Sequence, residues 1–187
     1  MFIGASAGIG RYFPRTPGGT TDPGLPVHVF LLAGQSNMVG RADFDGGAGY
    51  PADTLQYTKS TGFDSSYSST TLIDAASPLG HWDAVSGDMG LAIDFVTDYV
   101  AVNNVQAVLI PAADGGTGFA NGQWNPGDGQ YEHAVNATNA LMSANPTWLF
   151  QAVLWHQGES DQANANFAEN FYYMIQSMRN DITVATQ

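Results

Sequence analysis

A serine follows an apolar run of the sequence at the point where the run ends. Residues 29–33 are all apolar, and Gly34, Gln35, Ser36 and Asn37 come directly after them. A short continuous apolar run is typical of a buried strand, and a glycine lets the chain turn sharply at its end. Ser36 is therefore predicted to present its hydroxyl at the carboxyl end of a strand, the edge at which open α/β sheets bind ligands. A serine in that place can serve as a nucleophile.

A second group of polar side chains follows another apolar run far downstream. Residues 150–155 are mainly apolar, and they open into residues 156–161, which include a histidine, a glutamine, a glutamate and an aspartate. Because the carboxyl ends of parallel strands meet at one edge of a sheet, the two junctions predict a single site.

Three blocks of the sequence resemble one hydrolase superfamily. Residues 34–38 and 155–161 look like motifs of the SGNH hydrolases, and within that superfamily they are most similar to the sialate O-acetylesterase-like group, which includes family 6 acetylxylan esterases. Residues 110–117, followed by Trp124, resemble the glycine-bearing block of the same group. The resemblance extends from about residue 27 to residue 181. It implies a three-layer α/β/α sandwich with a central parallel sheet of the flavodoxin-like type. It also implies a serine esterase that removes O-acetyl groups from a carbohydrate through an acyl-serine intermediate.

The resemblance assigns roles to individual residues. Ser36 is the expected nucleophile, and its backbone N–H and that of Gly116 are expected to form part of an oxyanion hole. Gln157 matches the position at which the superfamily supplies a side-chain oxyanion donor, which we expect to stabilise the transition state. Glu159 resembles a residue that orients the catalytic histidine of related esterases. The substrate contacts expected around them are Gln35, Asn37, Thr117, Trp82 and Trp124.

Several of these residues also have an ordinary structural interpretation. Gly115 and Gly116 fit a tight turn that needs positive φ, and Gln157 fits a buried amide bonded to backbone. Asp161 is predicted to cap the helix that begins near residue 164. Three aromatic residues near the expected site are candidates for stacking on sugar rings, although such residues are more often part of a core: Trp82, Trp124 and Tyr131.

The general base is the missing part of the resemblance. Related enzymes end in an Asp-x-x-His motif, and no histidine follows Asp161. His28 is predicted at the head of the first strand, and His156 is expected to pack beneath the site. His81 and His133 are better interpreted as surface or substrate-contacting residues than as a base.

A serine hydroxyl is a weak nucleophile until a positioned base takes its proton, so three interpretations stay open. The chain is the N-terminal part of a longer hydrolase, or a further polypeptide segment completes its site, or it is a non-catalytic module. Such a module would bind glycan or serve as a structural part of a secreted or viral assembly. A lipolytic or thioester-cleaving enzyme of the same superfamily is a further alternative, but the polar, tryptophan-bearing loops favour sugar over lipid.

Composition excludes several classes of partner. The 187 residues are 44% hydrophobic, enough for one domain with a real core. With 5 basic and 17 acidic residues, the formal net charge is −12, which repels nucleic acid and anionic membrane surfaces. There is no cysteine, and His156, Glu159 and Asp161 lack the spacing of a helical metal motif, so no metal or cofactor is expected. No apolar run approaches the roughly 18 residues of a membrane helix.

The chain divides into an arm and a domain. Residues 1–26 are rich in proline and glycine and are predicted to be an extended arm, while residues 27–187 are predicted to form an SGNH hydrolase domain that lacks its C-terminal part. The N-terminus has no basic region and no long apolar core, so no signal peptide is recognisable. The acidic, lysine-poor composition favours an extracellular or virion-associated protein, and it also fits ordinary solubility.

The pattern of apolar residues predicts alternating strands and helices. Core strands are expected at residues 29–33, 105–110 and 148–155, and helices at 89–102, 131–143 and 164–179. Residues 41–80 are expected to be mostly loops, with an edge strand near residues 55–57. Strands that alternate with helices imply a parallel sheet with helices on both faces.

Overall fold

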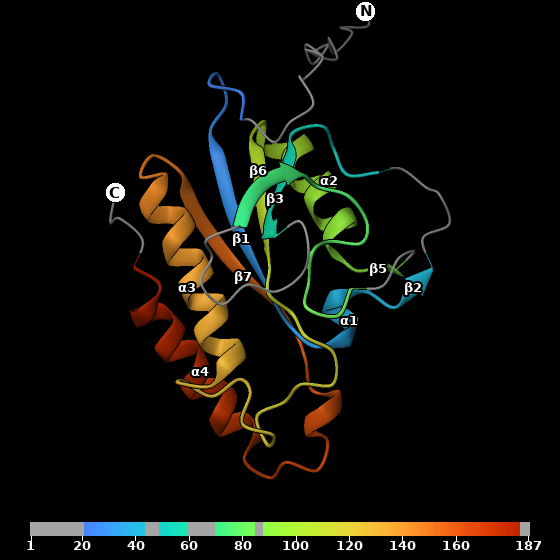
Figure 1. Cartoon of the computed structure of the whole chain (residues 1–187), viewed down its shortest axis with the longest axis vertical. Helices are drawn as coiled ribbons and strands as arrows, with labels where there is room; N and C mark the ends of the chain where they lie inside the picture. Colours follow the sequence, from blue (N-terminus) through green and yellow to red (C-terminus); the bar gives the residue numbers. More distant parts are fainter. Residues whose placement is uncertain (1–20, 44–48, 60–69, 85–87, 184–187) are drawn as a thin grey trace, which may run out of the picture.

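The computed structural model describes residues 21–43, 49–59, 70–84 and 88–183, whose arrangement is shown in Figure 1. Their centre is a five-stranded sheet with the strand order β4-β3-β6-β1-β7. Its strands are β1 (Val27–Gly34), β3 (Thr54–Lys59), β4 (Thr70–Asp74), β6 (Gln106–Pro111) and β7 (Leu149–His156). A two-stranded sheet pairs β2 (Ala42–Asp43) with β5 (Asp88–Met89). Most of the predicted N-terminal arm, residues 1–20, lies outside the described residues.

The three predicted core strands lie side by side. β1 pairs in parallel with β6 on one side and with β7 on the other. β1 and β6 are buried over nearly their whole length, as their continuous apolar sequences predict. β7 is an edge strand, and most of its residues are only partly buried.

One expectation about the sheet is wrong. Residues 55–57 belong to β3, which is not an edge strand but lies between β6 and β4. β4 pairs antiparallel with β3, so the sheet is mixed rather than wholly parallel. Most described side chains of β4 are exposed, and a polar edge strand has no apolar run that distinguishes it from a loop.

Helices cover both faces of the sheet (Figure 1). On one face lie α3 (Gly129–Ala144) and α4 (Phe167–Asp181), and on the other lie α2 (Ala92–Asn103) and the short α1 (Ser36–Val39). Successive side chains of β1 point to opposite faces, so that Leu31 packs in the core with α3 and α4 while Leu32 packs with α1 and α2. The predicted three-layer α/β/α sandwich is confirmed.

The predicted helices at residues 89–102, 131–143 and 164–179 correspond to α2, α3 and α4, with ends displaced by a few residues. α2 ends at Asn103 and is capped by Asn104, which adopts a left-handed conformation with φ of 53° and donates its N–H to the carbonyl oxygen of Val100. Among the described helices, none combines the length and the apolar character that a bilayer-spanning segment requires.

Candidate active site

The carboxyl ends of β1, β6 and β7 meet at one edge of the sheet. Gly34 is paired with His156 in the ladder between β1 and β7, and its carbonyl oxygen accepts a 3.1 Å hydrogen bond from the N–H of Asp114, which follows β6. Gly34 has φ of 130°, and a Cβ there would lie 2.1 Å from the carbonyl oxygen of His156. Only glycine allows the two strands to approach so closely. The predicted meeting of the strand ends is confirmed.

Ser36 lies directly beyond this junction as the first residue of α1. The N–H of Gln35 donates to the carbonyl oxygen of His156 at 2.9 Å, and the N–H of Gly40 donates to the carbonyl oxygen of Ser36 at 2.9 Å. The chain is therefore held on both sides of the partly exposed serine. Among the hydrogen bonds of the described residues, none involves the hydroxyl or the N–H of Ser36.

The two glycines of the loop after β6 have different environments. The N–H of Gly115 donates to Asp83 at 3.0 Å, and Asp83 pairs with Arg41 at 2.5 Å. A Cβ on Gly115 would lie 2.1 Å from the Asp83 carboxylate, so a larger residue at this position would clash with Asp83. Gly116 is exposed with φ of 72°, and a Cβ there would meet no atom within 4 Å. Its N–H has no acceptor within the described part of the chain, as an oxyanion donor requires.

Gln157 brings the two junctions into contact through its side-chain amide. Its Nε2 lies 2.6 Å from Asp161 Oδ2, 3.2 Å from Gln35 Oε1 and 3.3 Å from the carbonyl oxygen of Thr117. An amide nitrogen has two hydrogens, so both already have protein acceptors. Its Oε1 is buried and accepts no hydrogen bond. Gln157 thus lies just beyond the end of β7, as predicted. In this structure its amide N–H groups bond to neighbouring protein groups and are not free to donate to a ligand.

Four of the residues expected to contact substrate or considered for stacking on sugar are buried in this structure, so their predicted contacts with substrate stay predictions. Gln35 is 3% exposed, and its Oε1 accepts hydrogen bonds from the N–H groups of Gly158 and Ser160 as well as from Gln157. Thr117 is 1% exposed and accepts the indole N–H of Trp124, which is fully buried. Tyr131 is also buried, and its hydroxyl donates to Asp181 at 2.5 Å.

Three polar side chains near Ser36 and Gln157 in sequence lie exposed: Asn37, His156 and Glu159. The Asn37 side-chain amide donates to the Glu159 carboxylate, and His156 Nε2 lies 3.8 Å from the same carboxylate. The side chain of His156 is 47% exposed, so the expectation that it packs beneath the site is wrong. The predicted substrate contact at Asn37 and the orienting role of Glu159 are compatible with this exposure, and both stay predictions.

The four histidines are described, and no hydrogen bond among the described residues joins any of them to Ser36. His28 Nδ1 lies 2.8 Å from the hydroxyl of Tyr99. His81 is buried and accepts the N–H of Ala113 at Nδ1, and burial lowers its pKa to about 3. Burial also lowers the pKa of His133 to about 4, and its ring packs edge-on against Trp82, with centroids 5.1 Å apart. Both imidazoles are therefore neutral at pH 7. Trp82 is only partly buried, so its predicted contact with sugar stays a prediction.

Sequence reasoning missed the role of Asp161. The predicted helix cap is wrong, because α4 begins at Phe167 and its N-cap residue, Asn166, follows Asp161 by a whole turn. Asp161 is only 3% exposed, and its carboxylate accepts four hydrogen bonds, from Phe119 N (2.8 Å), Ala120 N (3.0 Å), Gln157 Nε2 (2.6 Å) and Asn164 Nδ2 (3.0 Å). Burial alone raises the pKa of this carboxyl, but the four donors outweigh it and hold the pKa below its ordinary value. No local pattern indicates this, because the first two donors are more than 40 positions away in sequence.

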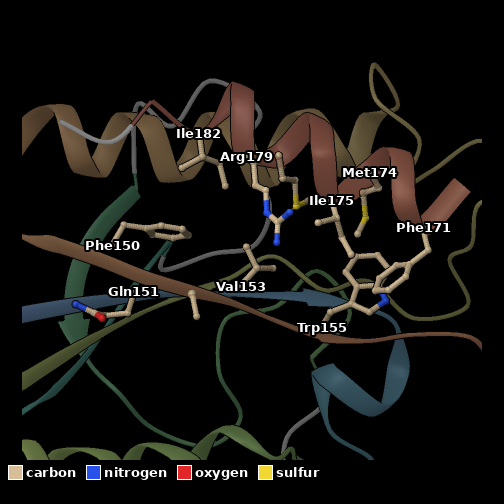
Figure 2. A pocket seen from close by; sticks show the side chains of 11 residues that line it. Phe150, Gln151, Val153, Trp155, Phe171, Met174, Ile175, Arg179 and Ile182 are labelled. Atoms are coloured by element: carbon tan, nitrogen blue, oxygen red, sulfur yellow. The ribbon is translucent and has the colours of Figure 1, made fainter. Parts of the chain in front are cut away.

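A cavity of about 500 Å³ lies apart from these residues, between β7 and α4. Figure 2 shows apolar side chains of both elements lining it, with the guanidinium of Arg179 reaching in from α4. Ser36, Gly116 and Gln157 do not line it. The cavity therefore belongs to the interface between sheet and helix rather than to the strand ends.

Comparison with known proteins identifies relatives of this chain. Residues 26–186 match the family described as carbohydrate esterase, sialic acid-specific acetylesterase. A probable carbohydrate esterase of Arabidopsis thaliana is 28% identical over an alignment of 179 positions, which covers 85% of this chain and 65% of that protein.

Solved structures show the same fold. NanS superposes with a TM-score of 0.70 at 19% identity, over 84% of this chain and 62% of NanS. An Arabidopsis thaliana protein gives a TM-score of 0.68 at 23% identity, over 84% of this chain and 69% of that one. A carbohydrate acetylesterase from Xanthomonas citri superposes with a TM-score of 0.59 at 17% identity, over 82% of this chain and 38% of that one. The chain thus spans less than two thirds of the length of NanS and of the probable Arabidopsis esterase.

Proposed function

The chain belongs to the carbohydrate esterase family of sialic acid-specific acetylesterases, and we propose that it acts as a serine esterase that removes O-acetyl groups from a carbohydrate. The observation that supports this most directly is the meeting of Ser36 and Gly116 at one sheet edge. The N–H groups of both residues lack acceptors within the described part of the chain. An acetyl oxygen that lies between two such donors is polarised for attack by the serine hydroxyl.

The proposed reaction has two halves. Ser36 Oγ bonds to the acetyl carbon while its proton passes to a base, and the carbonyl oxygen becomes an oxyanion that accepts the N–H groups of Ser36 and Gly116. The sugar oxygen then leaves and takes up the proton, so that an acetyl-serine forms. Water attacks the acetyl carbon in the second half, acetate leaves, and Ser36 regains its proton.

Gln157 is the third group of the proposed oxyanion site. Its longest contact is the 3.3 Å hydrogen bond to Thr117, and its shortest is the 2.6 Å bond to Asp161. We propose that the hydrogen facing Thr117 turns toward the oxyanion when it forms, while the bond to Asp161 is kept. This would make Gln157 a donor mainly in the transition state, where hydrogen bonds contribute most to rate.

The general base of the proposed reaction is not among the contacts of Ser36 in the described residues. We propose that a polypeptide segment outside residues 1–187 supplies it and reaches Ser36 beside the exposed carboxylate of Glu159. The coverage of the relatives supports this, because about a third of NanS and of the probable Arabidopsis esterase has no counterpart in this chain. Glu159 would then orient the incoming base.

The absence of a histidine at Ser36 among the described contacts favours one other function, a non-catalytic module that binds glycan. In that case Ser36 would have no effect on affinity, because a binding module has no transition state to stabilise. The exposed parts of Asn37 and Trp82 would then account for recognition.

Acetate release distinguishes the two functions. The substrates are an O-acetylated sialic acid and an acetylated xylo-oligosaccharide, and the protein is expressed with any sequence that its gene encodes after Gln187. An esterase releases acetate, and Ser36→Ala abolishes the release while calorimetry shows binding within about threefold of wild type. A protein that binds glycan, releases no acetate and is indifferent to Ser36→Ala is a binding module.

A further inference from the structure

We infer that Asp161 is a positioning residue of the proposed site: its buried carboxylate holds the Gln157 amide and the loop after β6 so that Ser36, Gly116 and Gln157 face one acyl group. The inference rests on the proposed esterase function. It concerns a residue that does not touch the substrate and acts through its neighbours.

The two carboxylate oxygens of Asp161 have different partners. Oδ2 accepts hydrogen bonds from Gln157 Nε2 and from the N–H of Phe119, so it connects the end of β7 to the loop after β6. Oδ1 accepts the N–H of Ala120 and the side-chain amide of Asn164, so it connects that loop to the segment before α4. The oxygen nearer the site is therefore Oδ2.

Asp161 makes the shortest of the three contacts that fix which way the Gln157 amide points. An ionised carboxylate only accepts hydrogen bonds, so a flipped amide would place its oxygen against Oδ2 at about the same distance as the present 2.6 Å bond. The present orientation directs Nε2 toward Gln35 and Thr117 as well. Gln35 directly precedes Ser36, so the carboxylate is linked to the nucleophile through two amides.

The loop is seated directly against the carboxylate. A Cβ on Gly118 would lie 2.7 Å from Asp161 Oδ2 and 3.2 Å from the Cβ of Ser160, so only glycine allows this approach. Gly118 is two residues from Gly116, whose N–H is the proposed oxyanion donor. A displacement of Asp161 is therefore expected to move Gly116 and Gln157 together.

The charge of Asp161 is balanced by hydrogen-bond donors. Within the described residues it forms no ion pair, and all four of its partners are amide N–H groups. Asp161→Asn keeps the shape but replaces one acceptor oxygen by an NH₂ group that faces donors. The variant therefore breaks two of the four contacts, either those of Gln157 and Phe119 or, with the new amide flipped, those of Ala120 and Asn164. In either orientation the loop after β6 loses one of the two bonds that hold it to this side chain.

The test compares Asp161→Asn with Ser36→Ala and with the matched control Asp128→Asn. Asp128 is also a loop carboxylate; it accepts the backbone and side-chain N–H groups of Asn125, each at 2.8 Å, and has no contact with Gln157. The protein is expressed with any sequence that its gene encodes after Gln187, as in the test of the proposed function. We measure its steady-state hydrolysis of p-nitrophenyl acetate, its thermal unfolding, and the ¹H–¹⁵N signal of the Gln157 side-chain amide. Asp161→Asn is expected to lower kcat at least about tenfold with KM within about threefold, and to shift the Gln157 signal. Asp128→Asn is expected to keep kcat within about twofold and to leave that signal in place.

The outcomes separate the inference from the proposed function. If Ser36→Ala hydrolyses the ester as fast as wild type, the proposed function fails and the inference fails with it. If Ser36 is required but a folded Asp161→Asn keeps its kcat, or loses no more than Asp128→Asn, the inference alone is overturned. If Asp161→Asn does not fold, Gly118→Ala takes its place, because its Cβ displaces Oδ2 without removing the charge. A folded Gly118→Ala with unchanged kcat also overturns the inference.

Discussion

The side-chain nitrogen of Gln157 lies 3.2 Å from the side-chain oxygen of Gln35, and this contact joins residues that are 122 positions apart in sequence. One amide precedes the candidate nucleophile Ser36, and the other follows the end of β7. The same oxygen of Gln35 accepts the N–H of Ser160 at 3.0 Å, so a single buried side chain connects both junctions. Gln157, which is expected to bind the oxyanion, therefore also helps to hold the site together.

Gln157→Ala is expected to reduce catalysis far more than substrate binding. The variant removes the proposed transition-state donor, and loss of one such donor typically costs about 3 kcal/mol, or about 100-fold in kcat. Stopped-flow or steady-state hydrolysis of p-nitrophenyl acetate provides kcat and KM separately. A rise in KM with unchanged kcat would show that Gln157 binds the ground state and transition state equally.

Gly116→Ala is expected to lower turnover at a small cost in stability. Its φ of 72° is unfavourable for alanine, which costs about 1–2 kcal/mol in unfolding free energy, but a Cβ there meets no atom within 4 Å. Relief of the strain would rotate the N–H away from the oxyanion. Gly127→Ala is the control, because Gly127 has φ of 91° and an equally open surrounding. Equal losses of activity in the two variants, measured beside urea unfolding, would refute a specific role for Gly116.

Trp124→Ala is expected to lower stability, whereas Trp82→Ala is expected to weaken substrate binding. Trp124 is fully buried, so its truncation should cost about 3–5 kcal/mol of stability, and any loss of binding should follow the loss of folded protein. Trp82 is partly exposed, so Trp82→Ala should stay folded and weaken affinity for an acetylated oligosaccharide. Urea unfolding and calorimetry of both variants check this. Unchanged affinity in folded Trp82→Ala would remove it from the binding site.

The free energy of unfolding is expected to fall as pH drops from 6.5 toward 4. Burial lowers the pKa of His81 to about 3 and that of His133 to about 4, so below pH 6.5 the unfolded chain binds protons that the folded chain does not. Each histidine that stays neutral in the folded chain then lowers the free energy of unfolding by about 1.4 kcal/mol for every unit that the pH falls. Asp114, whose pKa burial raises, acts in the opposite direction near its own pKa.

Urea midpoints between pH 4 and 7 measure this dependence. His133→Gln should flatten the curve above pH 4, and His81→Gln should do so while it keeps an acceptor for the N–H of Ala113. Ser36-dependent activity at pH 7 should persist in both variants, because neither imidazole bonds to Ser36 among the described contacts. Loss of turnover in folded His133→Gln or His81→Gln would identify the base that the described contacts do not show.

Most of the architecture could be predicted from the sequence, because burial leaves a regular pattern along the chain. Continuous apolar runs marked β1, β6 and β7, and apolar residues at helical spacing marked α2 and α4. β4 had no such pattern, since an exposed edge strand keeps polar side chains. The position of β3 inside the sheet could not be read locally either, because strand order depends on pairing between distant segments.

The sequence by itself determined that Ser36 follows the end of a buried strand, that a glycine lies at each turn of the site and that residues 156–161 belong to the same site as the serine. Each of these follows from residue types next to an apolar run. Only the tertiary structure decided which side chains face solvent: Gln35, Thr117 and Trp124 point inward, whereas Asn37 and Glu159 lie exposed. It also decided that Asp161 is a buried acceptor of four hydrogen bonds. The physical reason is that a polar side chain takes its partners from whatever segments packing brings near it, and the two loop N–H groups that Asp161 accepts come from more than 40 positions away.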